Sequence, residues 1–194
     1  MLLDATAGNR KMWMGRNPCI PYVVFMDREK ELRVPPDVLC DHRAMPFRDN
    51  CFELIIYDPP FMARRNPPRY WNDPKEIIFK NKRGFTASGS WWGLPKTKRE
   101  LLSTIHQAQL EFQRLSSKLC LKWTEVDYTL WKILPFFKDW IETYRQGFKQ
   151  ERTKKGTMGS IRASDDKYCK TWWILFRTKT IKCAEGKEKE KVMK

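Results

Sequence analysis

The stretch Leu54-Ile55-Ile56-Tyr57-Asp58-Pro59-Pro60-Phe61 decides the fold of this 194-residue chain. Four apolar or aromatic residues run into one acid and two prolines, which predicts a buried strand that stops at Asp58. Open α/β sheets bind ligands at the carboxyl ends of their strands, so Asp58 is a candidate site residue. Neither proline donates a backbone hydrogen bond, so this corner offers a carboxylate, carbonyl oxygens and the Phe61 ring. Such a corner suits a flat group that carries an amine, although many ordinary strands also end in an Asp-Pro turn.

Three short strands expected earlier in the chain end in the same way. Apolar runs lead directly into Asp4, Asp27 and Asp41, as the fourth run leads into Asp58. In a parallel sheet, these four acids would lie along one edge. Close carboxylates repel one another unless cations or hydrogen-bond donors lie among them. We therefore expect a ligand with a positive centre and several hydroxyl or amine donors.

The first loop and the second acid have the spacing of a mononucleotide-binding fold. Small residues and Gly8 follow Asp4, and small residues let a ligand approach the backbone. Asp27 lies nineteen residues after Gly8, where an acid commonly binds ribose hydroxyls. The loop has one glycine, so the G-x-G-x-x-G pattern is absent, and a short helix is expected from Asn9 to Trp13.

The formal net charge of +15 points to a polyanionic partner, with nucleic acid first and a membrane surface second. Between positions 62 and 99, ten Lys or Arg stand against two acids. The segment 62–97 is also rich in Trp and lacks periodicity. Cations mixed with aromatics fit a surface that holds phosphates and stacks bases. The alternative is a cover over the sheet whose charges are merely solvated.

Other features exclude several classes of function. No apolar run reaches the roughly 18–20 residues needed to span a bilayer, and no signal peptide precedes the first strand. The six cysteines form no CxxC pair, and two histidines make a metal site improbable. Unpaired thiols are typical of a reducing compartment, so a cytoplasmic protein is expected. No metal and no membrane association are expected either.

The second half of the chain alternates helices and strands. Thr97 is expected to cap a helix that runs to about Ser117. Lys122 lies near the end of the following strand, where it either faces the site or is only solvated. Further elements are expected as follows: a helix from Asp127 through Tyr144 that Pro135 kinks or divides, an edge strand over 148–152, an internal strand over 171–177, and a flexible tail over 182–194.

The ordered motifs resemble the class I S-adenosylmethionine-dependent methyltransferases. They are Leu3-Asp4-Ala5-Thr6-Ala7-Gly8, Phe25-x-Asp27, Asp41 followed by Met45-Pro46-Phe47, and Asp58-Pro59-Pro60-Phe61. The last motif more narrowly resembles enzymes that methylate the exocyclic amine of adenine (N6) or cytosine (N4). The resemblance runs from residue 1 to about 180. It implies a single α/β domain over 1–194 with a Rossmann-like methyltransferase fold, in which helices cover both faces of a mostly parallel seven-stranded sheet.

The resemblance also implies where S-adenosylmethionine would bind. Asp4 and Gly8 would border its methionine part, Asp27 would hold its ribose hydroxyls, and Asp41 would accept a hydrogen bond from its adenine amine. The neighbouring residues expected at this cofactor site are Ala5, Asn9, Arg28, His42 and Arg43. The cofactor site is expected to be either open, or closed by Trp13 or by the 62–97 segment.

For catalysis, the resemblance implies that the Asp58 carboxylate and the Pro59 carbonyl accept hydrogen bonds from the target amine. Pro60 keeps the corner rigid, and Phe61 would stack on the extruded base. The attacking amine is neutral, so no strong base is needed beforehand, and positioning would supply much of the acceleration.

The class of substrate is inferred from the small room that the chain has for a recognition domain. Methyltransferases that act on specific DNA sequences usually carry a sizeable recognition domain, and this chain has room only for the 62–97 segment. Structured RNA, ribosomal RNA first, is therefore favoured over DNA, and cytosine slightly over adenine. The expected substrate contacts are Arg64, Arg65, Trp91, Trp92 and Lys122. The alternatives are a small DNA amino-methyltransferase and a non-catalytic RNA-binding protein on a methyltransferase scaffold, which the single-glycine loop motivates.

Overall fold

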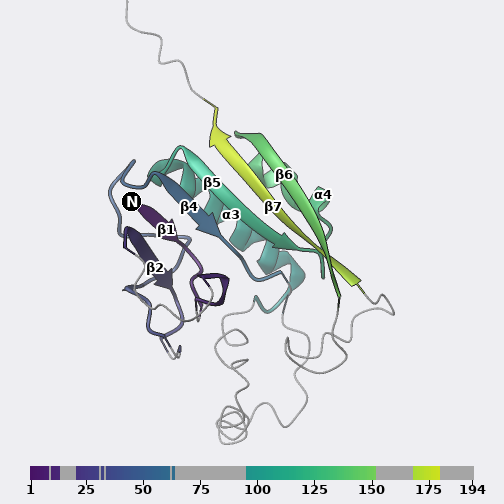
Figure 1. Ribbon diagram of the computed structural model, residues 1–194, viewed down its shortest axis with the longest axis horizontal. Coiled ribbons are helices and arrows are strands. Elements are labelled where there is room, and N and C mark those ends of the chain that lie inside the picture. The colour runs from purple at the N-terminus through teal and green to yellow at the C-terminus, as the bar shows by residue number, and fades with distance from the viewer. Residues whose placement is uncertain are drawn as a thin grey trace, which may run out of the picture.

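The computed structural model describes residues 1–8, 10–13, 21–30, 32, 34–61, 63, 95–151 and 168–179. Seven strands in these residues form one sheet in the order β3-β2-β1-β4-β5-β7-β6 (Figure 1). The strands are β1 (Leu2–Asp4), β2 (Val23–Asp27), β3 (Val38–Leu39), β4 (Leu54–Tyr57), β5 (Lys118–Thr124), β6 (Trp140–Glu151) and β7 (Tyr168–Thr178). The helical elements are the single turn η1 (Lys11–Trp13), α3 (Lys98–Leu115), α4 (Leu130–Ile133) and η3 (Leu134–Phe137).

The sheet has a parallel half and an antiparallel half. All pairings along β3-β2-β1-β4-β5 are parallel, whereas β7 runs antiparallel to both β5 and β6. From β1 the chain first builds the sheet outward through β2 and β3, and it then returns to add β4 on the other side of β1. The strand order therefore reverses between β1 and β4, which is where open α/β sheets bind ligands beyond the strand ends.

The core lies between α3 and one face of the sheet. Alternate strand residues such as Leu3, Ile55 and Leu121 point to this face and are fully buried, as expected for a period of two. Residues on one stripe of α3 pack against them: Leu101, Ile105, Ala108, Phe112 and Leu115. Thr97 caps the helix as predicted, since its Oγ1 accepts a hydrogen bond of 3.0 Å from the Glu100 backbone N–H.

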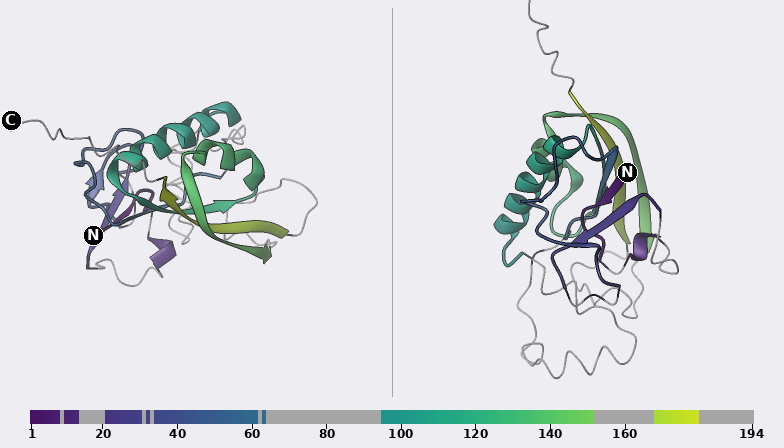
Figure 2. Two further views of the ribbon diagram at one scale, coloured as in Figure 1. Left: turned by 90° about the horizontal axis from the view of Figure 1, so that it is seen from above. Right: turned by 90° about the vertical axis from the view of Figure 1, so that its left-hand side faces the viewer.

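The two faces of the sheet carry different amounts of helix in the described part of the chain. Figure 2 shows α3 and α4 on one face and the η1 turn on the other. Trp13 of η1 packs edge-on against Phe25 of β2, with 5.7 Å between the ring centroids. The prediction of helices on both faces thus holds for α3 and α4 on one side and for a single 3-10 turn on the other.

The helix expected from Asp127 through Tyr144 is wrong in its second half. Its helical part ends with η3 at Phe137, and β6 begins at Trp140. The apolar spacing fits a helix, but hydrogen bonding with β7 over the length of β6 outweighs that local preference. The predicted edge strand is the distal part of β6, which does lie at the edge, and β7 is internal as predicted. The tail over 182–194 and nearly all of 62–97 lie outside the described residues.

Candidate ligand site at the strand ends

Three of the four predicted acids lie close together where the strand order reverses. Asp4 is the last residue of β1, Asp27 is the last of β2, and Asp58 directly follows β4. The Asp4 side chain is buried, and burial is the main cause that raises its pKa from 3.8 to about 6. The negative charges of Asp58 and Asp27 raise it further. A chain of strongly positive net charge thus concentrates negative charge at this point.

Trp13 covers the Asp4 carboxylate. Its indole Nε1 donates a hydrogen bond of 2.7 Å to Asp4 Oδ2, and the Thr6 backbone N–H donates one of 3.2 Å to Asp4 Oδ1. Both bonds favour the ionised carboxylate and partly offset its burial. The sequence left this site open or closed by Trp13 or the 62–97 segment; the structure places the Trp13 indole on Asp4, and the closing role stays a prediction.

Gly8 and Asp27 join the loop after β1 to the end of β2. The Gly8 N–H donates a hydrogen bond of 2.8 Å to Asp27 Oδ2, and the Glu29 N–H donates one of 2.9 Å to Oδ1. Gly8 has a φ of +50°, a left-handed conformation that residues with a Cβ rarely adopt. The single glycine of the loop therefore stands where the backbone requires it. Ala5, also predicted for this site, is buried, and its N–H donates to the carbonyl of Ile56.

Asp58 is held at both its backbone and its side chain. Its N–H donates a hydrogen bond of 2.9 Å to Thr6 Oγ1, and Lys122 Nζ lies 2.5 Å from Asp58 Oδ2. About a quarter of each side chain of this ion pair remains exposed. Burial raises the pKa of Asp58, and the Lys122 ammonium opposes that rise. Pro59, the next residue along the chain, is buried.

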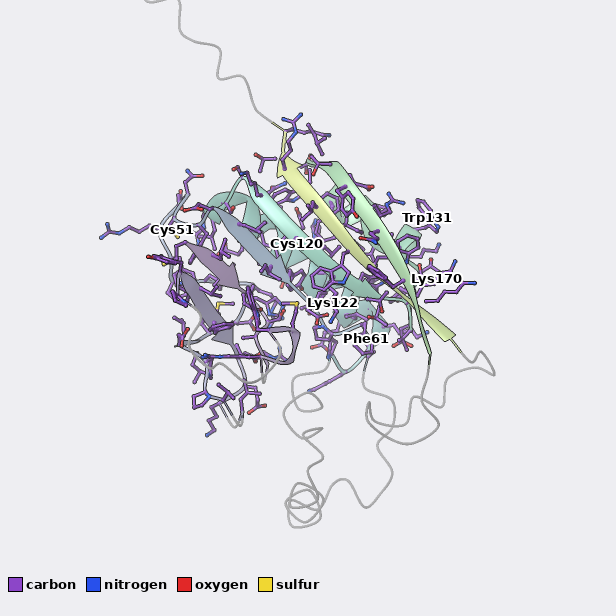
Figure 3. All side chains as sticks on the ribbon, viewed as in Figure 1. Cys51, Phe61, Cys120, Lys122, Trp131 and Lys170 are labelled. Carbon is purple, nitrogen blue, oxygen red and sulfur yellow. The ribbon has the colours of Figure 1, made fainter. Side chains whose placement is uncertain are left out.

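Lys122 lies on β5, and Phe61 lies in the segment that follows β4 (Figure 3). Phe61 is partly buried and packs against the core, so its ring is held in place. The sequence placed Lys122 among the possible substrate contacts, and in the structure its nearest partner is the carboxylate of the predicted catalytic acid.

Asp127 anchors the chain just beyond Phe61, a role that the sequence did not reveal. Its buried Oδ2 accepts a hydrogen bond of 2.7 Å from the Ala63 N–H, and Lys98 Nζ lies 3.6 Å from Oδ1. Asp127 was expected to cap a helix, but Thr129 occupies the N-cap of α4. A bond between residues 64 positions apart leaves no local signal in the sequence.

Asp41, the fourth acid, is already engaged by its neighbour. The Arg43 guanidinium and backbone N–H donate three hydrogen bonds to it, and those from the side chain lead the causes that lower its pKa to about 2. The His42 ring is buried, 5.5 Å from the Tyr57 ring, and burial lowers its pKa to about 4. The neutral imidazole therefore lies against the Tyr57 ring, and the cofactor contact expected beside Asp41 stays a prediction.

The structure describes only some of the remaining predicted site residues. Arg28 is exposed at the end of β2. Asn9, Arg64, Arg65, Trp91 and Trp92 lie outside the described residues. Within the described ranges, no cluster of three or more His, Cys, Asp or Glu residues could hold a metal ion. The helices described there are also too short or too polar to cross a membrane.

The fold and the site define an α/β protein with a mixed seven-stranded sheet and an acidic point at its strand reversal. No protein-family model matches the chain, and no curated protein matches it. Among solved structures, the chain is similar to the YcgJ protein from Bacillus subtilis. That match has 12% sequence identity and a TM-score of 0.43, and it covers 92% of this chain and 91% of the other.

Proposed function

We propose that this protein is an S-adenosylmethionine-dependent methyltransferase that acts on the exocyclic amine of a base in structured RNA. Ribosomal RNA is the first candidate, and N4 of cytosine is slightly favoured over N6 of adenine. One observation carries the proposal: Asp58-Pro59-Pro60-Phe61 follows β4 directly beside Asp4, where the strand order reverses. The Rossmann-like methyltransferase fold belongs to the same proposal.

The residues at the strand ends suit the cofactor. S-adenosylmethionine, when bound, supplies a methyl group on a positively charged sulfur, and the carboxylates of Asp4, Asp27 and Asp58 provide a negative environment for that charge. Asp27 accepts one backbone hydrogen bond on each oxygen, and a carboxylate has about four acceptor positions. It therefore retains capacity for ribose hydroxyls.

The chain's own groups would orient the target base. Lys122 occupies Asp58 Oδ2, which leaves Oδ1 and the Pro59 carbonyl as acceptors for the two hydrogens of an exocyclic amine. Phe61 would stack on the extruded base, and its packing against the core limits the motion of its ring. After transfer, the surplus proton on the base nitrogen would pass to Asp58 or to water.

The decisive experiment combines purified protein, S-adenosylmethionine with a labelled methyl group, and either structured RNA or duplex DNA. We expect label in RNA alone. Label in duplex DNA alone would instead identify a small DNA adenine or cytosine amino-methyltransferase. Mass-spectrometric analysis of nucleosides in RNA from cells that lack this protein would then name the modified base.

The basic 62–97 segment is proposed as the RNA-binding surface. Reversing the charges of Arg64 and Arg65 should weaken RNA binding and flatten its dependence on salt, because fewer counterions are released. Binding isotherms at several salt concentrations measure both effects. Unchanged binding would remove this segment from the RNA surface.

A second candidate function is a non-catalytic RNA-binding protein on the same scaffold. The loop after β1 favours it, because this loop has a single glycine and lacks the G-x-G-x-x-G pattern of nucleotide-binding loops. Calorimetry separates the two candidates: tight binding of S-adenosylmethionine supports the enzyme, and absence of binding supports the scaffold.

A further inference from the structure

A continuous chain of polar contacts crosses the sheet at the strand reversal. Asp4 Oδ1 accepts from the Thr6 N–H, Thr6 Oγ1 accepts from the Asp58 N–H, and Asp58 Oδ2 accepts from Lys122 Nζ. These hydrogen bonds thus link β1, the residue after β4, and β5. Thr6 fixes the backbone of Asp58, and Lys122 fixes its carboxylate.

Lys122 differs from a lysine that is merely solvated at a strand end. Only 23% of its side chain is exposed, and its Nζ lies 5.8 Å from the centre of the Trp173 ring. Trp173 is also the residue opposite Lys122 in the antiparallel pairing of β5 with β7. The ammonium is therefore held between a carboxylate and an aromatic ring, which leaves its side chain little freedom to move away.

We propose that Lys122 is a positioning residue that holds the Asp58 carboxylate as an anion and directs its Oδ1 toward the target amine. The inference rests on the proposed function for the identity of the amine. The ion pair itself is independent of that function. An ionised Asp58 accepts a hydrogen bond from one amine hydrogen through Oδ1, whereas a protonated carboxyl could donate a hydrogen bond there instead.

The charged groups around Asp58 allow a pH test. Lys122 from β5 carries the positive charge next to it, and Asp4 at the end of β1 carries a negative charge close enough to couple with it. Thr6 contributes a hydroxyl that does not titrate in this range. When the Lys122 charge is removed, the burial of Asp58 and the negative charge of Asp4 remain. Both favour the protonated form of Asp58 and therefore raise its pKa.

The first experiment follows the carboxyl carbon of Asp58 by NMR during a pH titration, with Asp58→Asn used to assign the signal. In Lys122→Met the midpoint should rise by about one pH unit or more relative to the wild type, because an opposite charge at this distance is lost. Lys122→Arg should restore it, since the guanidinium keeps the charge. Lys118→Met, at the exposed beginning of the same strand, should leave the midpoint unchanged.

The second experiment measures methyl transfer to RNA across pH. Lys122→Met should lower kcat about tenfold near neutral pH and move the acidic limb of the profile upward, with little change in the KM for cofactor. Lys122→Arg should recover most of the rate, and Lys118→Met should behave as wild type. Thermal unfolding of each variant checks that the fold is intact.

The outcomes separate the two hypotheses. If wild-type protein transfers no methyl group while Lys122→Met still raises the Asp58 midpoint, the methyltransferase proposal fails and the ionising role of Lys122 stands. If wild type is active and Lys122→Met changes neither the midpoint nor the acidic limb, the Lys122 inference is overturned. If Lys122→Met unfolds, Lys122→Gln at lower temperature provides the same comparison. An unchanged Asp58 midpoint in Lys122→Gln would likewise overturn the Lys122 inference.

Discussion

The indole Nε1 of Trp13 donates a hydrogen bond of 2.7 Å to Asp4 Oδ2, so a residue of the η1 turn meets the buried end of β1. Asp4 is 1% exposed, and this bond is one of two that stabilise its ionised form. The contact joins the loop after β1 to the acid on which the candidate site is centred.

Trp13→Phe keeps an aromatic ring against Phe25 but removes the donor. We expect a loss of about 1–3 kcal/mol in unfolding free energy at pH 8, because a buried charged acceptor loses a partner. The loss should shrink at pH 5, where Asp4, with a pKa of about 6, is mostly protonated. Urea unfolding at both pH values measures it. Trp131→Phe is the control, since Trp131 is 65% exposed, and an equal loss there would contradict the assignment.

The pH dependence of stability should show two opposing groups. The pKa of Asp4 is raised from 3.8 to about 6, so its stabilising contribution is present below pH 3.8 and is lost as the pH rises through 6. The pKa of His42 is lowered from 6.5 to about 4, so its contribution is present above pH 6.5 and is lost as the pH falls through 4. Each amounts to roughly 3 kcal/mol at 1.36 kcal/mol per pKa unit, and the two nearly cancel.

Single variants should expose each half of this balance. Asp4→Asn should lose stability relative to the wild type as the pH falls from 6.5 to 4, because His42 then acts unopposed. His42→Gln should instead gain stability relative to the wild type over the same fall. Urea unfolding at pH 4.5 and pH 7 provides the comparison. Parallel pH profiles for both variants and the wild type would show that neither group titrates as described.

Asp58→Ala should abolish methyl transfer while most of the cofactor affinity and the fold remain. The carboxylate is the predicted acceptor for the target amine, whereas Asp4 and Asp27, the predicted cofactor contacts, keep their own hydrogen bonds. Single-turnover transfer and calorimetric titration with S-adenosylmethionine measure the two effects. Asp49→Ala, which removes a mostly exposed carboxylate paired with Arg114, should retain full activity. Normal turnover by Asp58→Ala would exclude it from the reaction.

Gly147→Ala tests the packing between β6 and β7. A Cβ at position 147 would lie 2.7 Å from the indole of Trp172, too close for any real contact. We expect destabilisation of about 1–3 kcal/mol in denaturant unfolding, typical of an overpacked site. Gly147→Ala should cost less unfolding free energy in the Trp172→Leu background than in the wild type, because the indole ring is gone. An equal loss in both backgrounds would place the strain elsewhere.

The sequence predicted those features that depend on local pattern. The strands that end at Asp4, at Asp27 and just before Asp58 and the helix capped by Thr97 have clear apolar patterns and clear stop signals. The beginning of β6 was mistaken for helix, since its apolar residues fit both periods until β7 pairs with it. Long-range contacts also went unseen. The anchoring of Ala63 by Asp127 depends on residues brought together only by the tertiary fold.

Lys122 lies between these two cases. Its position near the end of a predicted strand suggested that it could face the site, yet its partner was not evident. The register of β5 against β4, in which Tyr57 stands beside Leu121, brings Lys122 to the residue that follows β4. Knowledge of the strand order would have supplied the pairing, because residues at matching strand ends become neighbours.

The division of the sheet into two halves also bears on the order in which the chain folds. β6 and β7 pair antiparallel along most of their length, whereas β1 must wait for β4, more than fifty residues later, to complete its pairing. Closing such long loops makes parallel pairings slow to form. Asp4, Asp27 and Asp58 all come from the slow half. A chain arrested with only β6 and β7 paired would therefore contain two long strands and none of the acids of the candidate site.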